Sequence, residues 1–227
     1  MELGKRCDFH MHSILSDGEL ITSEIARRAE ALGHQAIAIT DHADKTNLKS
    51  AVCGLVAAAR DINSFWEIKM LAGVELTHVP YQTINELART AKEFGANIVL
   101  VHGETPAEPV LPGTNAAAVR SRYVDILAHP GQLSQADAMI AADSGKYAEI
   151  TARAGHNRAN PHVARVCTEV GLKMLVNTDF HQPEDFITQE RALQIATDAG
   201  MEPRLALMTI KDNPRDLLAQ VEIHSRR

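Results

Sequence analysis

Residues 8–18, DFHMHSILSDG, bring together side chains that commonly bind metal ions. In an extended strand alternate side chains point the same way, so His10 and His12 share one face. The short turn that follows can return Asp17 to the same end of the strand. Imidazole and carboxylate groups together suit borderline divalent cations such as zinc, manganese and iron. This stretch therefore predicts part of a metal site, if the rest of the chain supplies further ligands.

The same residue types recur after other apolar runs of the chain. The candidates at or near predicted strand ends are His10, His12, Asp17, His42, Glu75, His102, His129, Asp179 and His181. One histidine after a strand is more often a hydrogen-bonded loop residue than a ligand, but nine such residues on one inferred face favour a metal centre. Nine ligands exceed the needs of one tetrahedral ion. We therefore expect two or three divalent metal ions (Zn, Mn or Fe).

Short apolar runs alternate with longer amphipathic segments, which indicates strands alternating with helices. Strands are predicted at 7–12, 36–40, 69–76, 97–101, 124–128, 147–151 and 173–178. Helices are predicted at 22–32, 48–65, 83–94, 114–122, 134–144, 160–170 and 187–199, and a closing helix at 213–227. This alternation implies parallel strands joined by right-handed crossovers.

The positions of the polar residues distinguish an open sheet from a closed barrel. No glycine-rich phosphate loop of the GxGxxG or GxxxxGK[ST] type follows any predicted strand, which removes the usual nucleotide-binding interpretation of an open sheet. An open sheet brings few strand ends to one crevice, whereas a barrel gathers all of them around one mouth. The sequence therefore predicts an α/β barrel of seven units, forming a single domain over residues 1–227.

Composition and charge restrict the class of protein. The formal net charge is −6 over 227 residues, so the composition gives no broad basic surface and disfavours binding of nucleic acid. The three cysteines are too widely spaced for a disulfide framework, which fits a reducing compartment. The N-terminus has no apolar run of signal-peptide length, and no stretch approaches the ~20 apolar residues of a membrane span. We expect a cytoplasmic protein that does not bind a membrane; its oligomeric state stays open.

The stretches DFHMHSILSDG, TDH, GVE, VHG, AHP and TDFH, in this order over residues 8–181, resemble the motif series of the PHP superfamily, the polymerase and histidinol phosphatase phosphoesterases. The resemblance implies a distorted (β/α)7 TIM-like barrel that holds up to three metals. It implies one ion on His10, His12, Glu75 and Asp179, a second on Glu75, His102 and His129, and a third on Asp17, His42 and His181. None of these nine positions departs from the family pattern.

The charge of such a centre indicates its substrate. Three divalent ions bring six positive charges, and Asp17, Glu75 and Asp179 return three negative ones, so the site would attract an anion such as a phosphate ester. Water activated by the ions supplies the nucleophile for in-line hydrolysis of a phosphomonoester. Glu75, as the bridging ligand, is one predicted catalytic residue. Asp17 and His181 are the others, because water near the third ion is the expected proton donor to the leaving oxygen.

Several further residues have weaker assignments. Arg153 and Arg158, just beyond the sixth strand, are predicted to bind the substrate phosphate. Asp8 is predicted to orient an imidazole ligand from behind. Glu104 and Glu149 could contact ligands or substrate, or be ordinary strand-end carboxylates. We assign His78 and His162 to helix or loop structure, and Lys45 to a solvated loop.

The leading hypothesis is a small metal-dependent phosphatase similar to histidinol phosphatase, acting on a small phosphorylated substrate. A phosphodiesterase or nuclease acting on nucleotides or nucleic acid is the alternative, because the same kind of site cleaves diesters. A non-catalytic RNA-associated barrel subunit ranks lower, since such a subunit does not need a full ligand set. An amidohydrolase also ranks lower, because its barrel needs fewer histidines and often a carbamylated lysine.

Overall fold

The computed structural model of the chain describes residues 2–224. Its strands are β1 (Cys7–Met11), β2 (Ala36–Ile39), β3 (His42–Ala43), β4 (Lys69–Leu76), β5 (Ile98–His102), β6 (Ile126–Ala128), β7 (Tyr147–Thr151) and β8 (Lys173–Asn177). Its α-helices are α1 (Thr22–Ala31), α2 (Leu48–Phe65), α3 (Ile84–Glu93), α4 (Thr114–Arg120), α5 (Gln135–Asp143), α6 (Asn160–Val170), α7 (Gln189–Asp198), α8 (Pro203–Ile210) and α9 (Asp212–His224).

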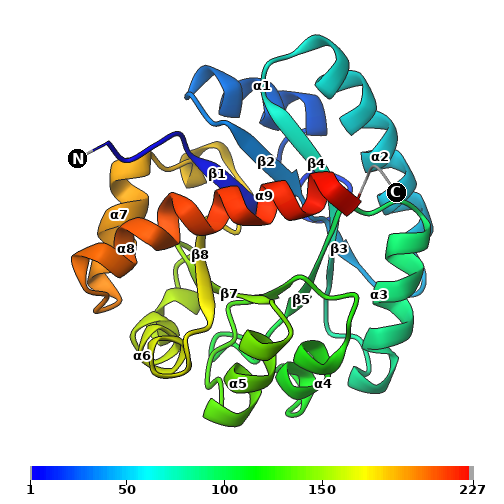
Figure 1. Cartoon of the computed structure of the whole chain (residues 1–227). Coiled ribbons are helices and arrows are strands. Elements are labelled where there is room, and N and C mark those ends of the chain that lie inside the picture. Colours follow the sequence, from blue (N-terminus) through cyan, green and yellow to red (C-terminus); the bar gives the residue numbers. More distant parts are fainter. Residues whose placement is uncertain (1, 225–227) are drawn as a thin grey trace.

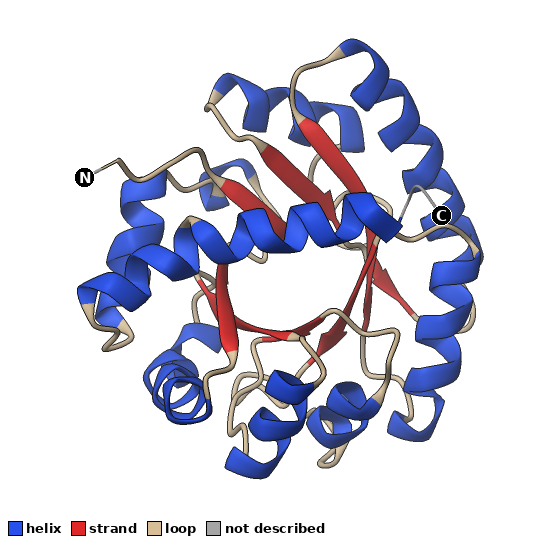
Figure 2. Ribbon diagram, in the orientation of Figure 1, coloured by secondary structure: helices blue, strands red, loops and turns tan. Residues whose placement is uncertain are grey.

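The strands form a nearly closed parallel barrel, and the helices surround it (Figures 1 and 2). Within residues 2–224, seven strands pair in the order β1-β2-β4-β5-β6-β7-β8, and the short β3 pairs with β4 beside this path. An isolated parallel bridge between Met11 and Phe180 continues the pairing from β1 to the segment after β8. The backbone N–H of His12 donates to the Phe180 carbonyl at 2.8 Å there. The predicted α/β TIM-like barrel is confirmed.

The strands form because both of their faces are buried, as is usual for parallel strands covered by helices. One apolar cluster fills the space between the strands and the outer helices. A second cluster lies inside the barrel, where Phe9 and Leu100 pack with Leu217, Leu218 and Val221 of α9. Helix α9 therefore closes the N-terminal end of the barrel, and Figure 1 shows it crossing that end. The opposite end, where the strands terminate, is left for the site.

The structure differs from the sequence-based expectation in two elements. No element was predicted between residues 199 and 213, where Pro203 suggests a break in helical structure, so helix α8 was missed. Pro203 instead occupies the first turn of the helix, where a missing N–H costs nothing. Strand β3 is too short to give a periodic signal. The predicted closing helix is confirmed as α9, and residues 225–227 of that prediction lie outside the described residues. None of the described helices is long and apolar enough to cross a membrane.

Candidate metal centre

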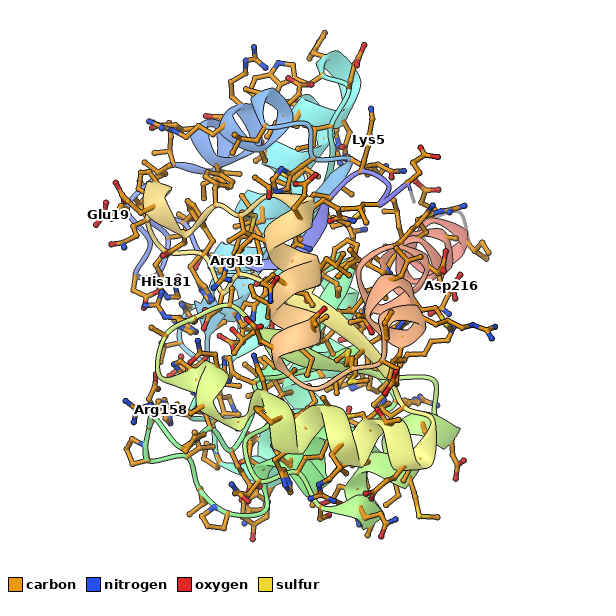
Figure 3. All side chains as sticks on the ribbon, turned by 90° about the vertical axis from the view of Figure 1, so that its left-hand side faces the viewer. Lys5, Glu19, Arg158, His181, Arg191 and Asp216 are labelled. Atoms are coloured by element: carbon orange, nitrogen blue, oxygen red, sulfur yellow. The ribbon has the colours of Figure 1, made fainter. Side chains whose placement is uncertain are left out.

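All nine predicted ligands lie at the C-terminal end of the barrel. His10 lies one residue before the end of β1, His42 begins β3, Glu75 lies in β4 and His102 ends β5. The others follow strands: His12 and Asp17 follow β1, His129 follows β6, and Asp179 and His181 follow β8. In Figure 3, His181 lies along the side of the molecule opposite Asp216 of α9, so the cluster is at the mouth and not at the closed end.

The fully buried Glu75 carboxylate is the centre of this cluster. Its Oε1 lies 3.4 Å from His10 Nε2, 3.4 Å from His102 Nδ1 and 3.3 Å from His129 Nε2. Its Oε2 lies 2.7 Å from His42 Nδ1 and 3.7 Å from His12 Nε2. One carboxylate therefore reaches five imidazoles from four segments of the chain, as a ligand shared by two ions would need to.

Asp179 forms the second carboxylate contact with the buried histidines. Its Oδ1 lies 3.2 Å from His12 Nε2 and 3.6 Å from His10 Nε2, and its Oδ2 lies 3.7 Å from His129 Nε2. Asp179 and His129 both have positive φ angles, 54° and 26°. Such conformations are uncommon for residues other than glycine and often occur at functional sites. Here they turn both side chains back over the barrel mouth.

A more open group lies at the edge of the mouth around Asp17. Asp17 Oδ2 is 3.2 Å from His181 Nε2 and 3.5 Å from His42 Nε2, and Asp17 Oδ1 is 3.9 Å from His12 Nδ1. The Asp17 side chain is 53% exposed, whereas Glu75 and Asp179 are buried. The mouth thus has a buried inner cluster, formed by Glu75, Asp179 and the histidines around them, and a solvent-facing outer group around Asp17.

The buried ligand atoms are arranged as a cation would require. Among the described residues, His10 Nε2, His12 Nε2, Glu75 Oε1 and His102 Nδ1 are buried and form no aligned hydrogen bond. Buried polar atoms are normally paired, and leaving them unpaired costs free energy. These atoms face one another, so a divalent cation would satisfy several of them at once. Nitrogen and carboxylate donors without thiolates fit Zn, Mn or Fe.

Burial and close opposite charges shift the pKa values of the carboxylates and histidines in this cluster. Burial raises the pKa of Glu75, but the neighbouring His10, His42 and His102 outweigh it and hold that pKa well below its usual value. Burial lowers the pKa of His10, yet Glu149, Glu75 and Asp179 raise it well above 6.5. In the absence of cations, a proton on His10 therefore balances part of the carboxylate charge, whereas burial lowers the pKa of His12 to about 4. Bound cations would replace such a proton.

Glu149 of β7 is the residue that orients His10. Its Oε1 lies 2.8 Å from His10 Nδ1 and accepts from Asn177 Nδ2 at 3.0 Å, and its Oε2 accepts from the His129 backbone N–H at 2.9 Å. The assignment of this role to Asp8 was wrong. The Asp8 carboxylate is instead paired with Arg6 at 2.9 Å and accepts backbone N–H groups, because it lies lower in the barrel.

Asp41 is a supporting residue that the sequence analysis missed. Its carboxylate accepts from the Ser13 backbone N–H at 2.7 Å, from Ser13 Oγ at 2.8 Å and from Ser16 Oγ at 2.7 Å. These bonds fold the turn that carries Asp17 to the mouth. The only signal for Asp41 was its place beside His42 in the motif TDH.

The two predicted phosphate-binding arginines are placed differently. Arg153 reaches the cluster, with Nε 3.8 Å from Asp179 Oδ2 and Nη1 3.6 Å from Asp185 Oδ2. It also lines a cavity of about 420 Å³ together with Thr178 and Gln182. Arg158 is exposed, and Figure 3 shows it on the mouth side of the molecule, away from His181.

The weaker assignments are resolved by their contacts. Glu104 is structural: its Oε1 accepts the backbone N–H groups of Gly113 and Asn115, both at 2.9 Å, at the start of α4. His162 is also structural, with Nε2 2.9 Å from the Leu133 carbonyl. His78 lies in the loop after β4, as assigned, and its ring also packs against the His102 ring with centroids 4.9 Å apart.

Glu108 and His156 also lie at the mouth and were missed as functional candidates. Glu108 Oε2 is 3.3 Å from His102 Nε2, and the buried His156 ring packs at a tilt of 43° against the His129 ring, with centroids 4.6 Å apart. Glu108 lies in the loop after β5, and His156 begins a short 3-10 helix (His156–Ala159) five residues after the end of β7. No periodic pattern places such residues in space.

Comparisons with known proteins agree with this architecture. The profile of the PHP domain matches residues 8–159. An uncharacterized protein of Methanocaldococcus jannaschii is 45% identical over 217 residues, covering 95% of this chain and 100% of that protein. A probable phosphatase of Caldanaerobacter subterraneus subsp. tengcongensis is 28% identical over 237 residues, covering 97% of this chain and 93% of the phosphatase. A chain in the structure of an archaeal ribonuclease P with mature tRNA has a TM-score of 0.69 at 13% identity, covering 97% of this chain and 91% of that chain, which is a likeness of fold.

Proposed function

The chain belongs to the PHP domain family of metal-dependent phosphoesterases, and from this membership and the geometry of the mouth we propose that it hydrolyses small-molecule phosphomonoesters at a centre of two or three divalent cations. The observation that carries the proposal is the convergence of buried, unpartnered nitrogen and oxygen atoms around Glu75. The similarity to a probable phosphatase along nearly the whole chain supports the same reaction.

The bound cations would lower the pKa of a water molecule from ~15.7 toward ~7 and withdraw charge from the phosphoryl oxygens. The residues of the chain set where this happens. Glu75 contacts imidazoles on both sides of the inner cluster, so it is the proposed bridging ligand between two ions. Asp179, His10 and His12 would hold one of these ions, and His102 and His129 the other.

Asp17, His42 and His181 are proposed to hold the third ion. Asp17 is 53% exposed, so this outer part of the mouth is open to the solvent into which the leaving alcohol departs. Asp17 and His181 lie 3.2 Å apart at that edge and would position a water molecule that donates a proton to the leaving oxygen. In this proposal the nucleophile attacks from the buried side and the leaving oxygen departs on the exposed side.

Arg153 is the proposed phosphate-binding residue of the chain, with Arg158 as a secondary one. The Arg153 guanidinium lies beside the ligand Asp179 and also lines the neighbouring cavity. Charge-assisted hydrogen bonds from a guanidinium to phosphate oxygens are strong and directional. The cavity of about 420 Å³ beside Arg153 would receive the alcohol part of a small substrate. A long nucleic acid would need a basic path, which the net charge of −6 does not favour.

The test is a phosphate-release screen on cation-loaded protein, with sugar phosphates, nucleoside monophosphates and histidinol phosphate as monoesters. Bis(p-nitrophenyl) phosphate and a short RNA serve as diesters. We expect cation-dependent release from a monoester and loss of at least ~100-fold in kcat for His10→Ala. His162→Ala is the matched histidine control and should retain wild-type turnover. Cleavage of diesters alone, or RNA binding without turnover, would refute the proposed substrate class.

A further inference from the structure

Beside the inner cluster, the Glu108 carboxylate contacts three histidines. They are His78, His156 and His102, and the last of these also belongs to the inner cluster. Glu108 Oε2 lies 3.0 Å from His78 Nε2 and 3.3 Å from His102 Nε2, and Glu108 Oε1 lies 3.4 Å from His156 Nε2. The histidines come from the segment after β4, from the end of β5 and from the segment after β7. One carboxylate therefore links three separate segments of the mouth.

The two ring nitrogens of His102 face different carboxylates. Nδ1 lies 3.4 Å from Glu75 Oε1, within the inner cluster, and Nε2 lies 3.3 Å from Glu108 Oε2. Both nitrogens are buried and neither forms an aligned hydrogen bond within residues 2–224. A neutral imidazole that binds a cation through one nitrogen carries its proton on the other, and an acceptor for that proton fixes the tautomer and the ring orientation. Glu108 is in the position of this acceptor.

Other histidines of the centre show the same arrangement. His10 has Nε2 toward Glu75 and Nδ1 2.8 Å from Glu149. His181 has Nε2 toward Asp17 and Nδ1 2.8 Å from the Asp179 carbonyl oxygen. In each case one nitrogen faces a proposed metal-binding carboxylate and the other faces an oxygen that can accept its proton. Glu108 completes this pattern for His102.

The backbone of His78 gives independent support. Among the described residues, the non-glycine residues with positive φ are His78 at 51°, His129 and Asp179. Such a conformation is uncommon for residues other than glycine and persists where the surroundings require it. His129 and Asp179 belong to the proposed metal centre, and the turn at His78 directs its ring to Glu108. This strain is explained if His78 has to hold the Glu108 carboxylate in place.

We propose that Glu108 is a positioning residue of the metal centre, which accepts the Nε2 proton of His102 so that Nδ1 binds the cation beside Glu75, while His78 holds the Glu108 carboxylate against His102. This inference rests on the proposed metal centre. It concerns the ion assigned to Glu75, His102 and His129, and it leaves the outer group around Asp17 unaffected.

The experiment is a cation titration of chelator-treated full-length protein, with Co²⁺ as the probe and a competing chelator to resolve each binding step. Wild type, Glu108→Ala, Glu108→Gln, His78→Ala and Glu19→Ala are compared. Glu19→Ala is the matched control, because Glu19 is an exposed carboxylate on the same side of the molecule (Figure 3). The unfolding midpoint of each chelator-treated variant verifies folding, and it should change little because the Glu108 side chain is 39% exposed.

We expect Glu108→Ala to weaken one binding step by about 10–100-fold and to leave the others within about twofold. Glu108→Gln should recover part of this loss, because its amide oxygen still accepts the Nε2 proton. His78→Ala should weaken the same step by less than Glu108→Ala does, and Glu19→Ala should match wild type. Unchanged binding in Glu108→Ala, or an equal loss in every step, would overturn the inference. Wild-type protein that binds no Co²⁺ would instead refute the metal centre itself.

Discussion

Replacing Glu149 by glutamine tests how the second layer of the barrel supports the metal centre. The buried Glu149 carboxylate accepts from Asn177 Nδ2 and from the His129 backbone N–H, and it faces His10 Nδ1 at 2.8 Å. A glutamine side chain has one acceptor oxygen and one NH₂ group. If the oxygen stays near His10 and Asn177, the NH₂ group faces the His129 N–H, and one buried donor loses its acceptor.

The magnitude follows from that loss. A buried unsatisfied donor costs about 1–3 kcal/mol. For a chain of this size each 1 kcal/mol lowers the unfolding midpoint by about 2–4 °C, so Glu149→Gln should lower it by roughly 2–12 °C. His10 also loses its charged hydrogen-bond partner, and removal of such a partner weakens metal binding by about 10–100-fold. Turnover at limiting cation concentration should fall by a similar factor and recover in part when cations are in excess.

The assays are thermal unfolding of the chelator-treated protein and a cation titration followed by phosphate release. Glu104→Gln is the control, because its single acceptor oxygen still receives the N–H groups of Gly113 and Asn115 at the start of α4. It should lose at most about 1 kcal/mol from the weaker interaction with the helix N-terminus, and its metal affinity should equal that of wild type. The reasoning is refuted if Glu149→Gln binds every cation as wild type does.

Three other predictions follow from the same geometry. Asp17→Asn should lower the number of ions bound by one per chain while leaving the unfolding midpoint of chelator-treated protein nearly unchanged, because Asp17 is 53% exposed; elemental analysis and thermal unfolding check this. Arg153→Ala should lower kcat/KM for the preferred phosphomonoester by about 10–100-fold, because about 1.5–3 kcal/mol of charged hydrogen bonding is lost. Arg158 is exposed, so Arg158→Ala should lower kcat/KM by less than about fivefold. Burial lowers the pKa of His34 from 6.5 to about 4, so as the pH falls below 6.5 the unfolded chain takes up a proton that the folded chain does not. This difference should lower the free energy of unfolding by roughly 3 kcal/mol between pH 6.5 and pH 4. Urea unfolding of chelator-treated protein should show that His34→Leu removes this component.

A specific result would contradict each of these three predictions. Unchanged metal content in Asp17→Asn would remove Asp17 from the ligand set. An Arg158→Ala loss larger than that of Arg153→Ala would reverse the proposed order of the two arginines. The same pH dependence in wild type and His34→Leu would show that His34 is not the buried group responsible.

The sequence was sufficient to bring together at one mouth the proposed ligands that lie next to strand ends. His10 and His12 follow from the period of two along β1, and Glu75, His102 and Asp179 follow from their places at the ends of apolar runs. In a parallel barrel these ends meet at one mouth, so order along the chain translates into proximity in space. The same reasoning predicted α9 from its apolar residues.

The sequence was not sufficient where depth or loop path decides the contact. Asp8 and His10 share a face of β1, but Asp8 lies one layer below, where Arg6 is its partner. Glu149 occupies the layer beside His10, which the strand period alone does not reveal. Glu108 reaches His102 through a long loop after β5, and such a path depends on tertiary packing and not on local periodicity.

The most direct test of the central claim measures phosphate release and bound cations on the same samples. Chelator-treated protein is loaded stepwise with Mn²⁺ or Zn²⁺, ions per chain are determined by elemental analysis, and turnover of the preferred phosphomonoester is recorded at each step. Our account predicts two or three ions per chain at saturation, turnover that rises only as a second ion binds, and loss of that turnover in His10→Ala. Full turnover with fewer than two ions per chain, or in His10→Ala, would contradict it.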